Sequence, residues 1–323
     1  MSTARLLAAA LAAASGLAGA ALAGPALAAP RLVIRDAAIN VVVQPENRSD
    51  IAVEVYRPAA RLPLQVLREG ADDVVIDGRL PRLFTSCHGS GEGLRVFVFG
   101  RGDFGLAQMP QVLVRAPADT VIESGGVVHG AVARAHSLTL DSSGCGDWTV
   151  ANVAGGLRAA VSGVGDLRAG ASQSADVTLS GTGHLAVGDV QSQLTARLSG
   201  AGALAARAAG AADLTISGSG ELTTGAIAGP LLVRLSGAGG LKTASVGGPV
   251  TADVSGVGHI RIGGGHAPSL SARVSGTGSV TFGGVADSLD ATVSGVGSVD
   301  VARVTGPVSQ HVSGVGSVHV GGR

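Results

Sequence analysis

The chain has 323 residues, of which 46% are hydrophobic, 14% are charged, only 2% are aromatic and 52 are glycine. The shortage of aromatic side chains disfavours a bulky globular core. The formal net charge is +0 and Lys242 is the sole lysine, so the chain lacks the basic patch with which proteins bind nucleic acid or an anionic membrane surface.

The segment from Met1 to Ala28 has the pattern of a secretory signal peptide. Arg5 precedes a run of leucine and alanine, and the small residues Ala26 and Ala28 form a cleavage site. A membrane anchor is the alternative, but glycines and Pro25 interrupt the run and no second apolar segment follows. We expect cleavage after Ala28, export, and no transmembrane segment in the mature chain.

Residues 29–120 contain short strand-like runs without a fixed period, among them RLVI, INVVVQ and LRVFVFG. An open end of a stacked β-structure would present unpaired backbone N–H and C=O groups. We therefore predict that residues 29–120 form irregular β-structure that caps the amino-terminal end of the repeat region that follows.

The chain has two cysteines, Cys87 and Cys145. In an oxidising compartment two cysteines more often pair than stay free, which predicts a disulfide between them. The alternative is a redox or metal-binding pair. It lacks the C-x-x-C spacing, although His88 adjoins Cys87.

Residues 121–323 carry a tandem repeat whose marker, Ser-Gly-x-Gly, recurs at an almost constant interval. A fixed period of about 19 residues indicates a solenoid. A degenerate copy begins at Ser124, and we expect the ten full copies to form bends with a structural role. The ten serines are Ser143, Ser162, Ser180, Ser199, Ser217, Ser236, Ser255, Ser275, Ser294 and Ser313.

Residues around each serine alternate between apolar and polar. In LTARLSG the residues five, three and one before the serine are Leu194, Ala196 and Leu198. Apolar residues also occupy alternate positions after the motif, as do Leu185 and Val187, five and seven places after Ser180. A period of two is the signature of a half-buried strand, whereas helical repeats need a period near 3.6. The sequence therefore predicts an all-β fold: a parallel β-helix of about eleven rungs, each made of two strands and a bend.

Outward positions also form columns along the predicted stack. Two places before the serine, successive rungs carry Arg234, Asp253 and Arg273. Opposite charges on adjacent strands attract each other, so we expect a ladder of alternating sign that helps to fix the register. A stripe that binds a ligand is the alternative interpretation.

An exported chain that opens with AINVVVQPENRSDIAVEVY and continues with V-x-L-S-G-x-G-x-L units resembles the head GIN domain family of auto-transporter adhesins, over roughly Arg31 to Gly322. The resemblance implies a β-helical protein in the periplasm or at the surface of a Gram-negative bacterium. The family's acidic residue after the motif is kept at Asp147, Asp166 and Glu221 but is replaced on the other rungs.

Few patterns in the sequence indicate chemistry. No copy of the motif meets the glycine spacing of a nucleotide-binding loop, and ten equivalent serines do not resemble one activated nucleophile. We predict no catalytic residue, no metal site and no cofactor. Asp176 and Asp213 share a column two rungs apart, which keeps open the alternative of a carbohydrate-active β-helix enzyme.

The sequence thus predicts a non-enzymatic, exported β-solenoid with an adhesin-like or structural role in the cell envelope. Its expected partners are glycan or envelope protein, bound along a repetitive face. Self-association through the last rung is a further expectation, because no capping segment is evident after Val320.

Overall fold

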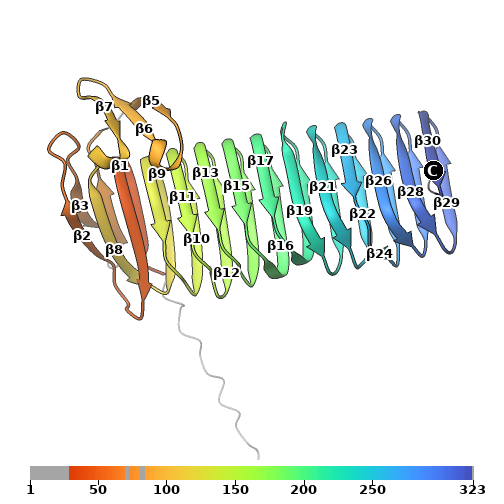
Figure 1. Cartoon of the computed structure of the whole chain (residues 1–323), viewed down its shortest axis with the longest axis horizontal. Helices are drawn as coiled ribbons and strands as arrows, with labels where there is room; N and C mark the ends of the chain where they lie inside the picture. Colours follow the sequence, from red (N-terminus) through yellow and green to blue (C-terminus); the bar gives the residue numbers. More distant parts are fainter. Residues whose placement is uncertain (1–28, 70–72, 81–83, 322–323) are drawn as a thin grey trace, which may run out of the picture.

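The computed structural model describes residues 29–69, 73–80 and 84–321. These residues form a parallel β-solenoid of about eleven turns, with irregular strands at its amino-terminal end and β30 at the other end (Figure 1). The predicted fold class is confirmed. The predicted signal peptide, residues 1–28 with its cleavage site after Ala28, lies outside the described residues.

Each rung contributes one strand to each of two faces. The strands that precede the serine bends form the first face, in which every strand pairs in parallel with its counterparts on the adjacent rungs. Its strands are β10 (Ser137–Ser142), β12 (Gly156–Val161), β14 (Ser174–Leu179), β16 (Val190–Leu198), β18 (Ala209–Ile216), β20 (Leu231–Leu235), β22 (Val250–Val254), β25 (Leu270–Val274), β27 (Leu289–Val293) and β29 (Val308–Val312).

The strands that follow the bends form the second face, also by parallel pairing. A return turn then leads back to the first face, and one such turn contains the short strand β24 (His266–Ala267). The strands of the second face are β11 (Cys145–Val150), β13 (Val164–Ala169), β15 (Thr182–Val187), β17 (Ala201–Ala206), β19 (Glu221–Ile227), β21 (Ala238–Val246), β23 (Val257–Ile262), β26 (Thr277–Ala286), β28 (Val296–Val304) and β30 (Val315–Val320).

The sequence period sets the register between rungs. Leu194 on β16 pairs with Ala175 on β14 and with Ala212 on β18, so residues at the same place in the repeat lie side by side. The rung between Ser255 and Ser275 has one residue more than the rungs on either side of it. This extra residue falls in the return turn between Gly265 and Leu270, where it leaves both faces in register.

The alternating apolar residues form the core between the two faces. Leu194, Ala196 and Leu198 are at most 1% exposed, and Ile260 and Ile262 on the second face are 0% exposed. Removing such side chains from water is the main favourable term in folding. The period-two pattern therefore identified the buried positions of the interior rungs.

Bend glycines allow the rungs to approach each other. A Cβ on Gly276 would meet the backbone oxygen of Gly256 on the preceding rung, and the same contact recurs along the stack. Among the glycines of the ten described motifs, only Gly146 and Gly183 have a positive φ. Close approach of backbones, rather than a left-handed conformation, is thus the general reason for glycine at the bends.

The amino-terminal strands continue the stack and then close it. β1 (Arg31–Glu46) and β9 (Asp119–Val132) each run along both faces and pair in parallel. β4 (Asp73–Asp77) and β8 (Gln111–Pro117) add a further parallel layer against β1. β3 (Gln65–Glu69) and β2 (Ala52–Arg57) then pair antiparallel with β4 and β8. These two strands cover the end of each face.

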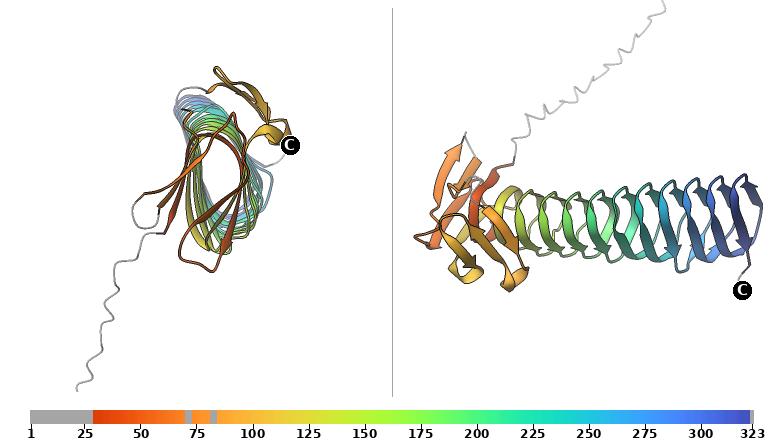
Figure 2. Two further views of the ribbon diagram at one scale, coloured as in Figure 1. Left: turned by 90° about the vertical axis from the view of Figure 1, so that its left-hand side faces the viewer. Right: turned by 90° about the horizontal axis from the view of Figure 1, so that it is seen from above.

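A separate three-stranded sheet lies beside this end of the solenoid (Figure 2). It consists of β5 (Phe84–His88), β6 (Arg95–Val98) and β7 (Gly102–Gly105), with 3-10 turns η1 (Gly91–Gly93) and η2 (Leu106–Gln108). Its buried residues, such as Val96 and Val98, pack with Ala38 and Val127 of the solenoid in a second, smaller apolar cluster.

The bend contact predicts a difference between two glycine substitutions. Gly276→Ala places a methyl group against the Gly256 backbone, so we expect the free energy of unfolding to fall by roughly 1–3 kcal/mol. Gly264→Ala, in a return turn with no atom within 4 Å of the added methyl, should change it by less than about 0.5 kcal/mol. Urea denaturation followed by circular dichroism measures both, and equal effects would contradict the explanation.

Candidate binding surface

The ten bend serines form a single exposed row along one edge of the solenoid, which we call the serine row. Their backbone N–H groups hold the bends, as in Ser275, which donates to the carbonyl of Val254, and Ser294, which donates to that of Val274. Adjacent rungs of a β-stack lie about 4.8 Å apart. The serine row is therefore a ladder of hydroxyl groups with a regular spacing.

Most of these hydroxyls are not used by the fold. Ser143 Oγ donates to the Ser124 carbonyl at 3.2 Å, and Ser162 Oγ is 3.5 Å from the Ser142 carbonyl. Within the described residues the other eight serines have no side-chain hydrogen bond. The motif pattern predicts a structural role for these serines in the bends. The backbone amides fill this role, which leaves the hydroxyls free to bind another molecule.

Shallow grooves lie along the serine row. One, of about 360 Å³, crosses β22, β25 and β27, and we call it the serine groove. Its polar lining combines hydroxyl groups with an ion pair, from Asp253, Ser255, Arg273, Ser275, Thr292 and Ser294. A second groove, of about 490 Å³, lies near the amino-terminal end and is lined by Ser143 and Ser162 together with Arg35, Glu123 and Asp141.

The charged side chains of the first face pair with one another. Arg273 Nη1 lies 3.7 Å from Asp253 Oδ1, as the predicted ladder requires. Arg234 instead reaches Asp213 on the preceding rung, at 3.3 Å. Asp213 is a diagonal neighbour of Arg234, within reach of its long side chain. These pairs are about half exposed, so each contributes at most about 1 kcal/mol and serves mainly to fix the register.

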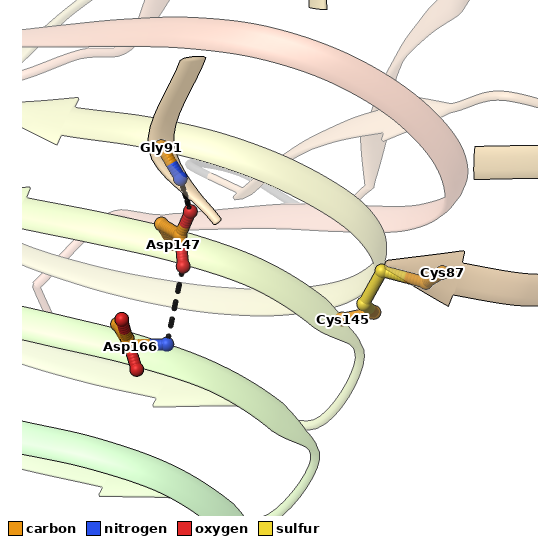
Figure 3. Close-up of a disulfide and its surroundings, with 5 residues drawn as sticks. All are labelled: Cys87, Gly91, Cys145, Asp147 and Asp166. Atoms are coloured by element: carbon orange, nitrogen blue, oxygen red, sulfur yellow. Dashed lines mark hydrogen bonds between the residues drawn. A yellow bond between two sulfur atoms is a disulfide. The ribbon is translucent and has the colours of Figure 1, made fainter. Parts of the chain in front are cut away.

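Two acidic residues after the motif are part of the structure rather than of an open site. Asp147 is 4% exposed; its Oδ1 accepts a hydrogen bond from the Asp166 N–H at 3.2 Å and its Oδ2 accepts one from the Gly91 N–H (Figure 3). Asp166 Oδ1 in turn accepts from the His184 N–H at 3.0 Å. These carboxylates bind the backbone of neighbouring segments.

Cys87 and Cys145 form a disulfide that ties β5 to the start of β11 (Figure 3). Their Cα atoms are 6.5 Å apart and 58 residues separate them in sequence. Cys145 occupies the variable position of the first full Ser-Gly-x-Gly motif. Together with the bond between Gly91 and Asp147, the disulfide fastens the small sheet to the solenoid.

The two carboxylates that keep the enzyme alternative open, Asp176 and Asp213, are each paired with an arginine. Asp176 and Asp213 share a column with Thr195 between them, as the sequence predicts. Each carboxylate lies against an arginine, however: Asp176 is 2.7 Å from Arg197, and Asp213 pairs with Arg234. Both carboxylates are partly exposed and neither lies in an apolar pocket.

The carboxyl groups whose pKa is shifted also favour the ionised form. In the described part of the chain, the carboxyl groups whose pKa is clearly shifted all have a value below the ordinary one, because neighbours stabilise the ionised form. The principal causes are hydrogen bonds from Arg48 to Asp50, from the Arg79 N–H to Asp77, from Ser137 to Asp119, from Lys242 to Glu221 and from His266 to Asp287.

Two other features are absent from the residues that the structure describes. No cluster of three or more His, Cys, Asp or Glu side chains has the geometry to hold a metal ion. No helix there is long and apolar enough to cross a membrane.

The motif spacing predicts where each bend serine lies in the chain but not the surroundings of its hydroxyl group. The spacing of a motif reveals the register, whereas the exposure of a side chain depends on how the bend turns in three dimensions. The anchoring role of Asp147 was also missed, because its partner Gly91 is 56 residues away in the chain.

The disulfide predicts a local effect on the small sheet. Replacing both Cys87 and Cys145 by serine removes a cross-link worth about 4 kcal/mol for a loop of this length. We expect the amides of β5–β7 to lose protection from hydrogen exchange, while β25–β28 keep theirs, because solenoid rungs contact only their neighbours.

A matched control is Val164→Ser, at the same motif position on the next rung, where the side chain is 58% exposed. It should leave the exchange of β5–β7 unchanged. Unaltered protection of β5–β7 in the double cysteine variant would contradict the anchoring role.

A protein family matches part of the chain. Neither a curated protein nor a solved structure matches the chain. The family that the sequence pattern resembles was expected to extend from about Arg31, whereas the match covers only residues 207–323, which run from the return turn after β17 through β30. Over residues 207–323 the chain matches the family described as "Putative auto-transporter adhesin, head GIN domain".

Proposed function

We propose that the protein is an exported, non-enzymatic, adhesin-like β-solenoid that binds glycan or protein of the cell envelope along its serine row. The observation that carries the proposal is the row of exposed hydroxyl groups, most of which have no partner within the fold. The adhesin description of the family that matches residues 207–323 is consistent with this role.

A regular row of weak sites suits a ligand that is itself repetitive or extended. One hydrogen bond contributes only about 0.5–1.5 kcal/mol, which is too little for useful affinity. When one ligand contacts several rungs, the later contacts form within the same complex and the affinity rises steeply. The rigid register between rungs keeps such contacts at fixed intervals.

The serine groove offers the most favourable part of this surface. Ser255, Ser275 and Ser294 present three hydroxyls on successive rungs, and Arg273 and Asp253 beside them supply a donor and an acceptor. Hydroxyl and amide groups of a glycan or peptide can be hydrogen-bonded by this set. The paired carboxylates of the rungs favour binding over cleavage.

The test compares two triple variants of the protein, expressed as the full chain and purified after export. Ser255→Ala/Ser275→Ala/Ser294→Ala removes the groove hydroxyls. The matched control, Thr223→Ala/Ser279→Ala/Thr281→Ala, removes three hydroxyl groups of the second face, on β19 and β26. Retention is measured on peptidoglycan, on outer-membrane fractions and on a glycan panel, and the incubated glycans are chromatographed for cleavage products.

We expect saturable retention without cleavage products, about tenfold weaker for the groove variant and unchanged for the control. Equal loss in both variants would contradict the serine row as the binding surface. Cleavage products would support the enzyme alternative instead, and no retention on any material would leave the proposal without a ligand and refute it.

A further inference from the structure

The two ends of the solenoid differ in how their strand edges are covered. At the amino-terminal end, β2 and β3 pair antiparallel with the last parallel layer. At the other end of the described chain, every residue of β29 is exposed, and Val308, Val312, Val315 and Val320 are between 43% and 79% exposed. Exposed strand edges with apolar side chains readily pair with another strand.

Gln310 breaks the apolar pattern at this end. It lies three places before its serine, an inward position, and pairs in register with the buried Ala291. On the nine preceding rungs this column is apolar: Leu140, Ala159, Val177, Ala196, Leu214, Val233, Ala252, Ala272 and Ala291. An amide in a core position needs a hydrogen-bonding partner if it is to be covered. Gln310 therefore points to a partner with a polar group at the same place.

The open backbone groups of β29 belong to its inward residues. On the preceding rung, Leu289 N–H donates to the Pro307 carbonyl and the Val293 carbonyl accepts from the Ser313 N–H. Alternate residues of a strand point their groups to the same side. By the same alternation, Val308, Gln310 and Val312 direct their N–H and C=O groups to the uncovered side.

The sequence of β29, Val-Ser-Gln-His-Val, is nearly the same in chemical type when read backwards. In antiparallel pairing centred on Gln310, Val308 faces Val312 of a second copy and Gln310 faces its own counterpart. Each of these opposed pairs then exchanges two backbone hydrogen bonds. The two Gln310 amides can bond to each other in the core, much as a buried asparagine fixes the register of a coiled coil.

β30 permits the same symmetry. Centred on Val318, antiparallel pairing sets Ser317 opposite His319 of the second copy and Gly316 opposite Val320. A Cβ on Gly316 would lie 2.7 Å from Val293 Cγ1, so the position three after a serine faces the position one before it across the core. Val318 lies two places after Gly316, and Gln310 lies two places before Val312, so Val318 faces Gln310 across the core. A single two-fold axis can therefore pass through the centre of the β29 pair at Gln310 and the centre of the β30 pair at Val318.

We propose that two copies of the protein join end to end through β29 and β30, around a two-fold axis that passes through Gln310 and Val318. The capped amino-terminal end prevents the head-to-tail stacking that would give a fibre, so the assembly closes at two copies. The dimer is a rod of about twice the length with a serine row in each half. This inference does not depend on the ligand of the serine row.

The first test is the state of association of the exported protein and of Gln310→Arg. Sedimentation equilibrium should show a dimer at micromolar concentration, and small-angle scattering should give a maximum dimension about twice that of the monomer. Two facing guanidinium groups would be buried without a counter-charge, so Gln310→Arg should weaken dimerisation at least about 100-fold. Gln191→Arg, the same change at an exposed site of β16, is the control and should stay dimeric.

The second test fixes the register. Ser309→Cys/His311→Cys should form intermolecular disulfides on mild oxidation, because directly opposed residues of this kind lie about 4.5 Å apart between Cα atoms. Ser309→Cys alone should not cross-link, since Ser309 faces His311 of the second copy and not its own counterpart. Circular dichroism confirms that each variant is folded.

The proposal would be overturned if the wild-type protein stayed monomeric at a concentration 100-fold above the micromolar range of the first test. A dimer that Gln310→Arg leaves intact, that is no longer than the monomer, or that fails to cross-link in the double cysteine variant would overturn it as well.

Discussion

The parallel hydrogen-bond register between successive rungs is the constraint on which the rest of the structure depends. Every strand of an interior rung must match its neighbours on both sides, residue for residue, and the bends must bring backbones together closely enough for this. Glycine at the bend removes the Cβ that would prevent the approach, as the contact between Gly276 and Gly256 illustrates. The constant repeat length, the high glycine content and the narrow core of small aliphatic residues all follow from the need to match adjacent rungs residue for residue.

The same constraint determines where function can reside. Inward side chains form the core, and the backbone groups form the hydrogen bonds between rungs. The outward columns, the bends and the two ends are therefore the parts of the solenoid that can bind another molecule. The first face pairs its charges internally, and Asp147 and Asp166 bind neighbouring backbone. Within the described residues, the fold does not use the hydroxyls of eight of the ten bend serines or the backbone groups at the uncovered edge of β29 and β30. A binding role for the serine row and dimerisation through the edge both rest on this observation.

The sequence alone predicted the all-β solenoid, the bend positions and the inward residues. The alternation of apolar and polar residues shows which side chains point inward, and the fixed repeat length shows which residues of adjacent rungs lie side by side. Leu194, Ala196 and Leu198 are examples of these inward residues. It did not predict the partner of Arg234, which a diagonal contact decides, nor the continuation of the stack into β1, β4 and β8, where no period is visible. The exposure of the serine hydroxyls was missed because it depends on the path of the bend.

The most direct measurement of the central claim compares two deletions. Removing residues 276–294 joins Ser275 to Gly295 and takes out one complete rung, so the register of the following strands is retained. Removing residues 276–284 takes out about half a rung and places β27–β30 out of phase. Hydrogen exchange should show β27–β30 protected in the first variant and unprotected in the second. Equal protection in both variants would contradict the claim that the register between rungs holds the solenoid together.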